Sequence, residues 1–174
     1  MAKSEIKAIK VKRREIPLFL SSGLQSDKEK RMYYKIRAWA KEEGFSPIYT
    51  IGISVPTPKP ENISKAEHEY ISKSECFIAI VGARWNINGF AHSYSVHDEI
   101  SIAKAQNKPI YLFLEKGVRG EGGIKYKADK RFTFENWEIE VPEGEYRFGE
   151  ELRGIKEEIC HRASRCESVC GWRL

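Results

Sequence analysis

Residues 76–82, which read CFIAIVG, form the most uniformly apolar segment of the chain. Both alternating faces of this segment carry apolar side chains, which is typical of a strand buried on both faces of a parallel sheet. Residues 16–20 and 110–114 are similar apolar runs. We therefore predict that residues 76–81 form an interior parallel strand that lies between these two segments.

Strand-like and helical segments alternate on the N-terminal side of this strand. Residues 16–21 (IPLFLS) and 46–51 (SPIYTI) are short apolar runs that predict strands. Between them, Ser26 and Glu29 have the spacing of a capping box, which predicts the start of a helix that ends at Gly44. This order predicts a strand, helix and strand unit.

The same alternation continues through the middle of the chain. Ser64 and Glu67 have the capping-box spacing again and predict a short helix ahead of residues 76–82. A loop is expected at residues 83–94, followed by a helix at residues 95–106 and a strand, PIYLFL, that ends at residue 114. Alternating strands and helices predict a parallel sheet with right-handed crossovers.

The C-terminal third has a weaker pattern. Residues 131–135 and 137–141 show short strand-like alternation, and a final amphipathic helix follows Gly149. Its inward positions are predicted to be Leu152, Ile155 and Ile159. Taken together, the pattern predicts an α/β fold: a flavodoxin-like three-layer sandwich around a central parallel five-stranded sheet of order 2-1-3-4-5.

Length and charge predict one domain preceded by a basic arm. The chain has 174 residues, enough for one full core, and a net charge of +5. Residues 1–15 carry six basic and two acidic side chains and no aromatic ones, so we interpret them as a solvated arm and expect no nucleic-acid partner. Residues 16–174 are predicted to form the single α/β domain with its C-terminal helix.

Hydropathy and cysteine content predict the setting in which the protein works. No apolar run approaches the ~20 residues of a membrane helix, and the charged N-terminus lacks a secretory core, so we expect a cytoplasmic protein without a membrane partner. Cys160, Cys166 and Cys170, with His161 beside the first, lack the paired short spacing of common zinc sites. We predict neither a metal nor a disulfide framework here.

Candidate site residues follow from the sheet. Ligands of open parallel sheets bind beyond the carboxyl ends of the strands, where Ser21, Ser22 and Gly23 form a small, donor-rich turn.

Glu99 is the candidate functional carboxylate on the helix expected at residues 95–106. It falls about 60° from Val96 around this helix, on the flank of the apolar face. Burying a carboxylate there costs free energy unless the group is paired or has a function. The alternative is that Glu99 only complements the helix dipole.

These segments together resemble the TIR-like superfamily, with the related nucleoside 2-deoxyribosyltransferases. The resemblance is carried by FLSSG (19–23), GFSPIY (44–49), SECFIAIVGARW (74–85) and SVHDEISIAKAQNKPIYLF (95–113), and it covers roughly residues 16–114. This chain departs from the TIR pattern at two places. Ser95 stands four residues before Glu99, at the position where TIR domains often have a tryptophan, and the loop after residue 51 is rich in proline.

The resemblance implies cleavage of an N-glycosidic bond at the ribose C1′ carbon. It identifies Glu99 as the catalytic carboxylate and NAD as the substrate, with release of nicotinamide in prokaryotic defence or signalling. NAD is then a substrate and no cofactor is expected, and self-association into a homo-oligomer is expected to complete the site. The residues assigned to substrate binding are Ser21, Ser22, Gly23, Trp85 and Ser95.

Two other functions remain open at this point. A carboxylate stabilises the cationic sugar that forms when cationic nicotinamide leaves, so this reaction needs no general acid. A deoxyribosyltransferase-like enzyme would need a second acid, for which His92, His97 and Asp98 are candidates, although we expect His97 to face solvent. The third function is a protein-interaction or nucleotide-sensing module without catalysis.

Overall fold

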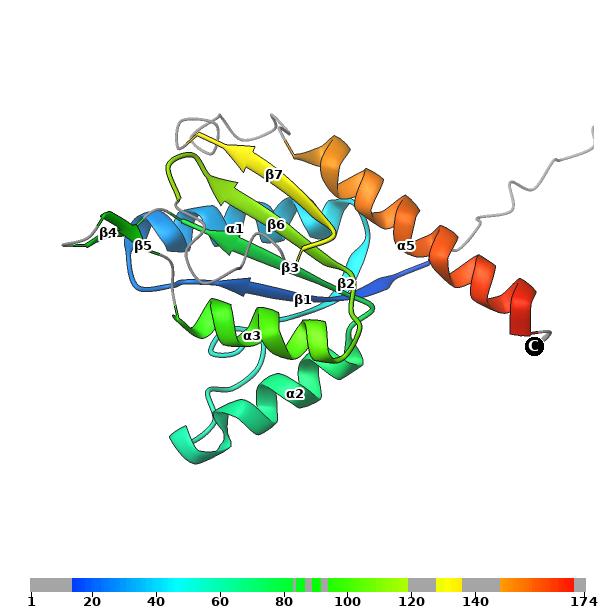
Figure 1. The fold of residues 1–174 in the computed structure, drawn as a ribbon, viewed down its shortest axis with the longest axis horizontal. Helices are drawn as coiled ribbons and strands as arrows, with labels where there is room; N and C mark the ends of the chain where they lie inside the picture. Colours follow the sequence, from blue (N-terminus) through cyan, green and yellow to red (C-terminus); the bar gives the residue numbers. More distant parts are fainter. Residues whose placement is uncertain are drawn as a thin grey trace, which may run out of the picture.

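A parallel sheet of five strands forms the centre of the computed structural model (Figure 1). In sheet order, its strands are β2 (Phe45–Tyr49), β1 (Ile16–Ser22), β3 (Cys76–Val81), β6 (Ile110–Glu115) and β7 (Lys130–Phe134). The structure describes residues 14–82, 84–86, 89–91, 94–118, 128–135 and 148–170, with only the backbone of 84–86, 89–91, 94–95 and 165–170. The predicted fold class and strand order are confirmed.

The strand β3 lies in the interior of the sheet, as its sequence predicts. It pairs in parallel with β1 on one side and with β6 on the other, and all six of its residues are buried. β6 is buried along its whole length as well. Two adjacent strands without a solvent-exposed face require a layer of helices on each side of the sheet.

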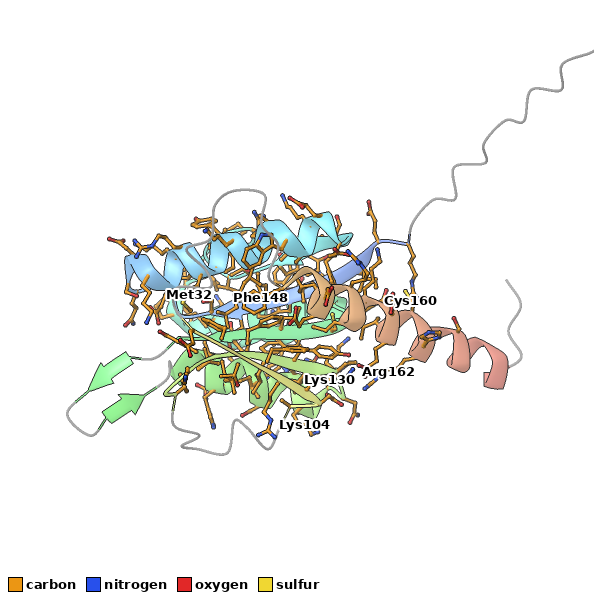
Figure 2. All side chains as sticks on the ribbon, turned by 90° about the horizontal axis from the view of Figure 1, so that it is seen from above. Met32, Lys104, Lys130, Phe148, Cys160 and Arg162 are labelled. Atoms are coloured by element: carbon orange, nitrogen blue, oxygen red, sulfur yellow. The ribbon has the colours of Figure 1, made fainter. Side chains whose placement is uncertain are left out.

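Helices cover both faces of the sheet (Figure 1). α1 (Asp27–Glu42) and α5 (Gly149–Cys170) pack on one face, and α2 (Ile63–Lys73) and α3 (Tyr94–Ala105) pack on the other. The predicted inward side chains of α5 at Leu152, Ile155 and Ile159 are buried. Figure 2 shows Phe148, just before α5, among the core side chains, where its ring packs against Trp39, Phe113 and Phe134.

Strand alternation divides the core into two clusters. Leu18 and Leu20 of β1 belong to the cluster beneath α1 and α5, whereas Phe19 belongs to the cluster beneath α2 and α3. Successive side chains of a strand point to opposite faces, so Ser21 shares the face of Phe19 and Ser22 shares that of Leu20. The two adjacent serines are therefore directed toward different helical layers.

The helix starts predicted from the sequence have different outcomes. The Ser26 and Glu29 box is present in full at the start of α1. The Ser64 and Glu67 prediction is wrong, because α2 begins one residue before Ser64, with Asn62 as an N-cap that makes no side-chain bond. α3 begins at Tyr94, one residue before the start expected at residue 95, so Ser95 lies inside its first turn.

Other sequence predictions differ from the structure in detail. The loop expected at residues 83–94 contains a short antiparallel pair, β4 (Arg84–Asn86) and β5 (Gly89–Ala91). The strand-like pattern at residues 131–135 corresponds to β7, while that at 137–141 lies outside the described residues. A single 3-10 turn, η1 (Pro60–Asn62), follows the proline-rich loop and leads into α2.

The predicted arm is described only from Arg14, whose guanidinium pairs with Glu75 at 2.7 Å. Residues 1–13 lie outside the described part of the chain, so the predicted domain boundary is untested. Within the described residues, no helix has the length and apolar character that a membrane crossing requires.

Candidate functional site

Glu99 is a buried carboxyl near the start of α3, on the face of the sheet that α2 and α3 cover. Its side chain follows the apolar stripe of Val96, Ile100 and Ala103, all of which are buried in the same cluster. Sheet residues complete the apolar surroundings of α3: Ala79, Val81, Leu112 and Leu114. Glu99 is only 9% exposed. The predicted placement on the flank of the apolar face is confirmed.

Ser21 connects the end of β1 to this carboxyl. The Ser21 hydroxyl donates a hydrogen bond to Glu99 Oε2, and Ser21 itself is only 1% exposed. The bond links groups 78 residues apart in the sequence. It exists because alternation along β1 directs Ser21 toward α3. The structure thus brings together two of the predicted site residues.

The surroundings of Glu99 disfavour its charged form. Burial, opposed by the hydrogen bond from Ser21 and assisted by the nearby carboxylates of Glu67 and Asp98, raises the pKa of Glu99 to about 8. Glu99 is therefore mostly protonated at neutral pH. A carboxyl with this pKa at the carboxyl edge of a parallel sheet has the property expected of a functional group.

Glu67 is a second buried carboxyl, on α2, that the sequence interpretation assigned to helix capping. It is only 8% exposed, and burial, followed by the charge of Asp98, raises its pKa. Packing of α2 beside α3 is fixed by polar contacts: Gln106 Nε2 donates to the carbonyl of His68 at 3.0 Å. The burial of Glu67 depends on how α2 packs in the fold, so no local sequence signal identified it.

The second serine of the predicted pair lies in a different setting. Ser22 is half-buried, and its hydroxyl donates to the carbonyl of Gly23 at 3.1 Å. Ser22 points toward the α1 layer and Gly23 is buried in the turn that follows. The structure therefore separates Ser21 from Ser22 and Gly23 with respect to Glu99.

An ion pair that the sequence interpretation missed lies at the same edge, on the α1 face. Lys28 of α1 pairs with Glu115, the buried last residue of β6. Gly82, directly after β3, lies close to this pair: a Cβ there would be 3.2 Å from Met32 Cε and 3.7 Å from Glu115 Oε2. The position of Glu115 at the carboxyl end of a predicted strand was the available signal.

The remaining predicted residues are only partly described. Trp85 lies in β4 and Ser95 in α3, but their side chains lie outside the described part of the structure, as does all of His92. His97 is half-buried instead of facing solvent fully, with Nδ1 at 3.7 Å from Oδ1 of the exposed Asp98.

The expected absence of a metal and of a cofactor stays a prediction. Among the described side chains, no group of three or more histidine, cysteine or acidic residues is placed to hold a metal ion. Cys76 and Cys160 are free thiols. The side chains of Cys166 and Cys170 lie outside the described part, so the prediction for the C-terminal cysteines stays a prediction.

Comparison with solved structures identifies proteins with the same fold. A CMP N-glycosidase, BcmB, from Clostridium botulinum matches with a TM-score of 0.50 and 20% identity, covering 68% of this chain and 88% of that one. A 2-deoxyribosyltransferase from Bacillus psychrosaccharolyticus matches with a TM-score of 0.54 and 15% identity, covering 74% and 93%. A conserved protein from Enterococcus faecalis V583 matches with a TM-score of 0.51 and 12% identity, covering 73% and 96%.

No family model and no curated protein sequence matches this chain. At these identities the three structures demonstrate a shared fold. One of the three is a 2-deoxyribosyltransferase, and none of the three is described as a TIR domain. The chain therefore has the α/β fold also found in a nucleoside 2-deoxyribosyltransferase and in a CMP N-glycosidase.

Proposed function

We propose that this protein cleaves the N-glycosidic bond of a nucleotide, with Glu99 as the catalytic carboxylate. The observation that carries the proposal is the buried Glu99 carboxyl, held by Ser21 beyond the carboxyl end of β1. A carboxylate shielded from water interacts strongly with positive charge that develops on a sugar ring. A helix-dipole role would require neither the burial nor the bond from a distant strand.

NAD is the substrate that we propose first. The C1′–N bond breaks with its electron pair moving to the pyridinium nitrogen, so nicotinamide leaves as a neutral molecule without an added proton. The Glu99 carboxylate stabilises the oxocarbenium-like ribose, and water adds to C1′ and releases its proton to solvent. The described site supports this choice because NAD cleavage needs a single carboxyl, which Glu99 provides, and the ionised fraction of Glu99 that the reaction uses grows as pH rises toward 8.

A deoxyribosyltransferase-like or nucleotide glycosidase activity is the second candidate. The fold shared with a 2-deoxyribosyltransferase and a CMP N-glycosidase favours it. A neutral base must gain a proton as it leaves, so this reaction needs an acid in addition to the carboxylate. Among the described candidates, Asp98 is exposed and His97 is half-buried beside it.

One experiment separates these proposals. Purified protein is incubated separately with NAD, with CMP, and with a deoxynucleoside plus an acceptor base, and products are identified by chromatography and mass spectrometry. The assay covers a range of protein concentrations, because the TIR-like resemblance implies assembly into a homo-oligomer. Nicotinamide and ADP-ribose from NAD are the expected products, and Glu99→Gln is the control.

The other outcomes assign the site differently. Free cytosine from CMP, or a new nucleoside formed with the acceptor base, would show that the second candidate activity is the correct one and that NAD is not the substrate. Binding of nucleotides without any product at all concentrations would favour the sensing or interaction module. NAD cleavage would also support the role in prokaryotic defence or signalling that the resemblance implies, which consumption of NAD inside cells would then test.

A further inference from the structure

We propose that Ser21 is a positioning residue that acts through Glu99 by holding its carboxylate form, and that the buried Glu67 on the adjacent helix opposes this effect. The inference rests on the proposed function and assigns Ser21 a role different from substrate contact. It also gives a role to a buried acid on α2 that the proposed reaction does not otherwise use.

Ser21 has almost no access to solvent or to a bound substrate. Its side chain is 1% exposed, and its hydroxyl is engaged with Glu99 Oε2. A hydroxyl that is buried and already donating its hydrogen has little opportunity to bind a ribose or phosphate. Ser22, one residue later, is half-buried and points toward the other layer. The position of Ser21 therefore favours action on the carboxyl and not on the substrate.

Glu67 lies on α2, which packs beside α3. α2 packs beside α3 through the contact of Gln106 with the carbonyl of His68 and through Lys108 Nζ, which lies 2.9 Å from the carbonyl of Ser72. Glu67, adjacent to His68, is buried and interacts electrostatically with Glu99 and Asp98. Two carboxyls that share a poorly solvated region resist being ionised together.

Besides burial, the groups with the largest effects on Glu99 come from three elements. Ser21 comes from β1, Glu67 from α2 and Asp98 from α3 itself, with His97 3.7 Å from Asp98. β3 and β6 present apolar side chains to α3. Ser21 thus favours the ionised form of Glu99, whereas Glu67 and Asp98 oppose it, and burial opposes it most.

Opposite effects of two substitutions follow from this arrangement. Ser21→Ala removes the donor, so the pH at which Glu99 is half-ionised should rise by about one pH unit. Glu67→Gln removes a neighbouring negative charge with little change in shape, so the midpoint should fall by a similar amount. If the carboxylate is the active form, activity well below the midpoint should decrease about tenfold in Ser21→Ala and increase in Glu67→Gln.

The test measures the Glu99 carboxyl directly, so it does not depend on turnover. Carbon-13 NMR of the glutamate carboxyl carbons is recorded against pH, and the Glu99 signal is assigned by its loss in Glu99→Gln. Ser21→Thr retains the hydroxyl and should restore the midpoint. The matched controls are Ser22→Ala and Glu69→Gln, the latter an exposed α2 glutamate paired with Lys73, and neither should move the Glu99 midpoint.

Activity is measured on the same proteins with NAD or the substrate found in the product assay. Parallel movement of the NMR midpoint and of the pH profile of kcat/KM, with KM little changed, supports the proposal. An unchanged Glu99 midpoint in folded Ser21→Ala and Glu67→Gln overturns it, as does a control that moves the midpoint equally. Midpoint movements without any turnover would retain the ionic coupling but refute its part in a reaction, together with the proposed function.

Discussion

Glu99→Gln should make the protein more stable while abolishing its proposed activity. The pKa of Glu99 is raised from 4.5 to about 8 in the folded protein, mainly by burial. Between these values the folded state binds a proton that the unfolded state releases, so the wild type loses stability as pH rises. Glutamine has nearly the same shape and cannot ionise, so the variant avoids this loss.

The magnitude follows from proton linkage. Each pH unit between the two pKa values is worth about 1.4 kcal/mol of stability. At pH 7, about 2.5 pH units above 4.5, the variant should be more stable than the wild type by on the order of 3 kcal/mol. Near pH 4.5 the difference should nearly vanish, because Glu99 is then largely protonated in both states.

The assay is urea denaturation at several pH values, combined with turnover measurements on the same preparations. Turnover should fall by a factor on the order of 10² or more, the scale of losing one electrostatic partner of a transition state. Glu69→Gln, at an exposed position of α2, should show no comparable pH-dependent gain. A Glu99→Gln protein that is less stable than the wild type at pH 7 would refute the buried-carboxyl argument, and unchanged turnover would remove Glu99 from the site.

Three further substitutions test how the fold holds the site. Gly44→Ala should lower stability by about 1–2 kcal/mol, because Gly44 has a φ of +91° and a Cβ there would lie 2.6 Å from Lys156 Nζ. Its control, Gly154→Ala in α5, meets no atom within 4 Å and should raise stability by about 0.5–1 kcal/mol in the same urea titration; equal effects would contradict the strain argument. Thr50→Val should lower stability by about 1–3 kcal/mol in thermal melts. The Thr50 hydroxyl accepts from the buried Tyr33 hydroxyl at 3.0 Å and donates to the Leu20 carbonyl at 2.8 Å, and valine leaves both groups without this partner. A neutral effect would show that this chain of hydrogen bonds is dispensable. Phe148→Ala should cost about 3–5 kcal/mol by denaturant titration, because its ring packs on three aromatic rings beneath α1 and α5; unchanged stability would mean that the start of α5 is not held by this contact.

Much of the fold is encoded in local patterns. Residues 76–81 are apolar on both faces, which is enough to predict an interior strand, and β3 is one. The spacing of Ser26 and Glu29 predicts a reciprocal cap, which is present. The same spacing at Ser64 and Glu67 fails, because a 3-10 turn leads directly into α2 and starts the helix at Ile63, before the predicted cap, which a local motif cannot show.

Less of the candidate site than of the fold can be predicted from local sequence patterns. Helical periodicity alone placed Glu99 on the flank of an apolar face, because the 3.6-residue repeat is a local property. The bond from Ser21 to Glu99 and the pair of Lys28 with Glu115 join groups 78 and 87 residues apart. Strand alternation predicts that Ser21 and Ser22 point to opposite faces, but the path of the crossovers decides which helix covers each face. The sequence by itself therefore determined the elements and the candidate carboxyl, whereas the tertiary structure decided its hydrogen-bond donor, its neighbouring charges and its ionisation, because these depend on contacts between distant segments.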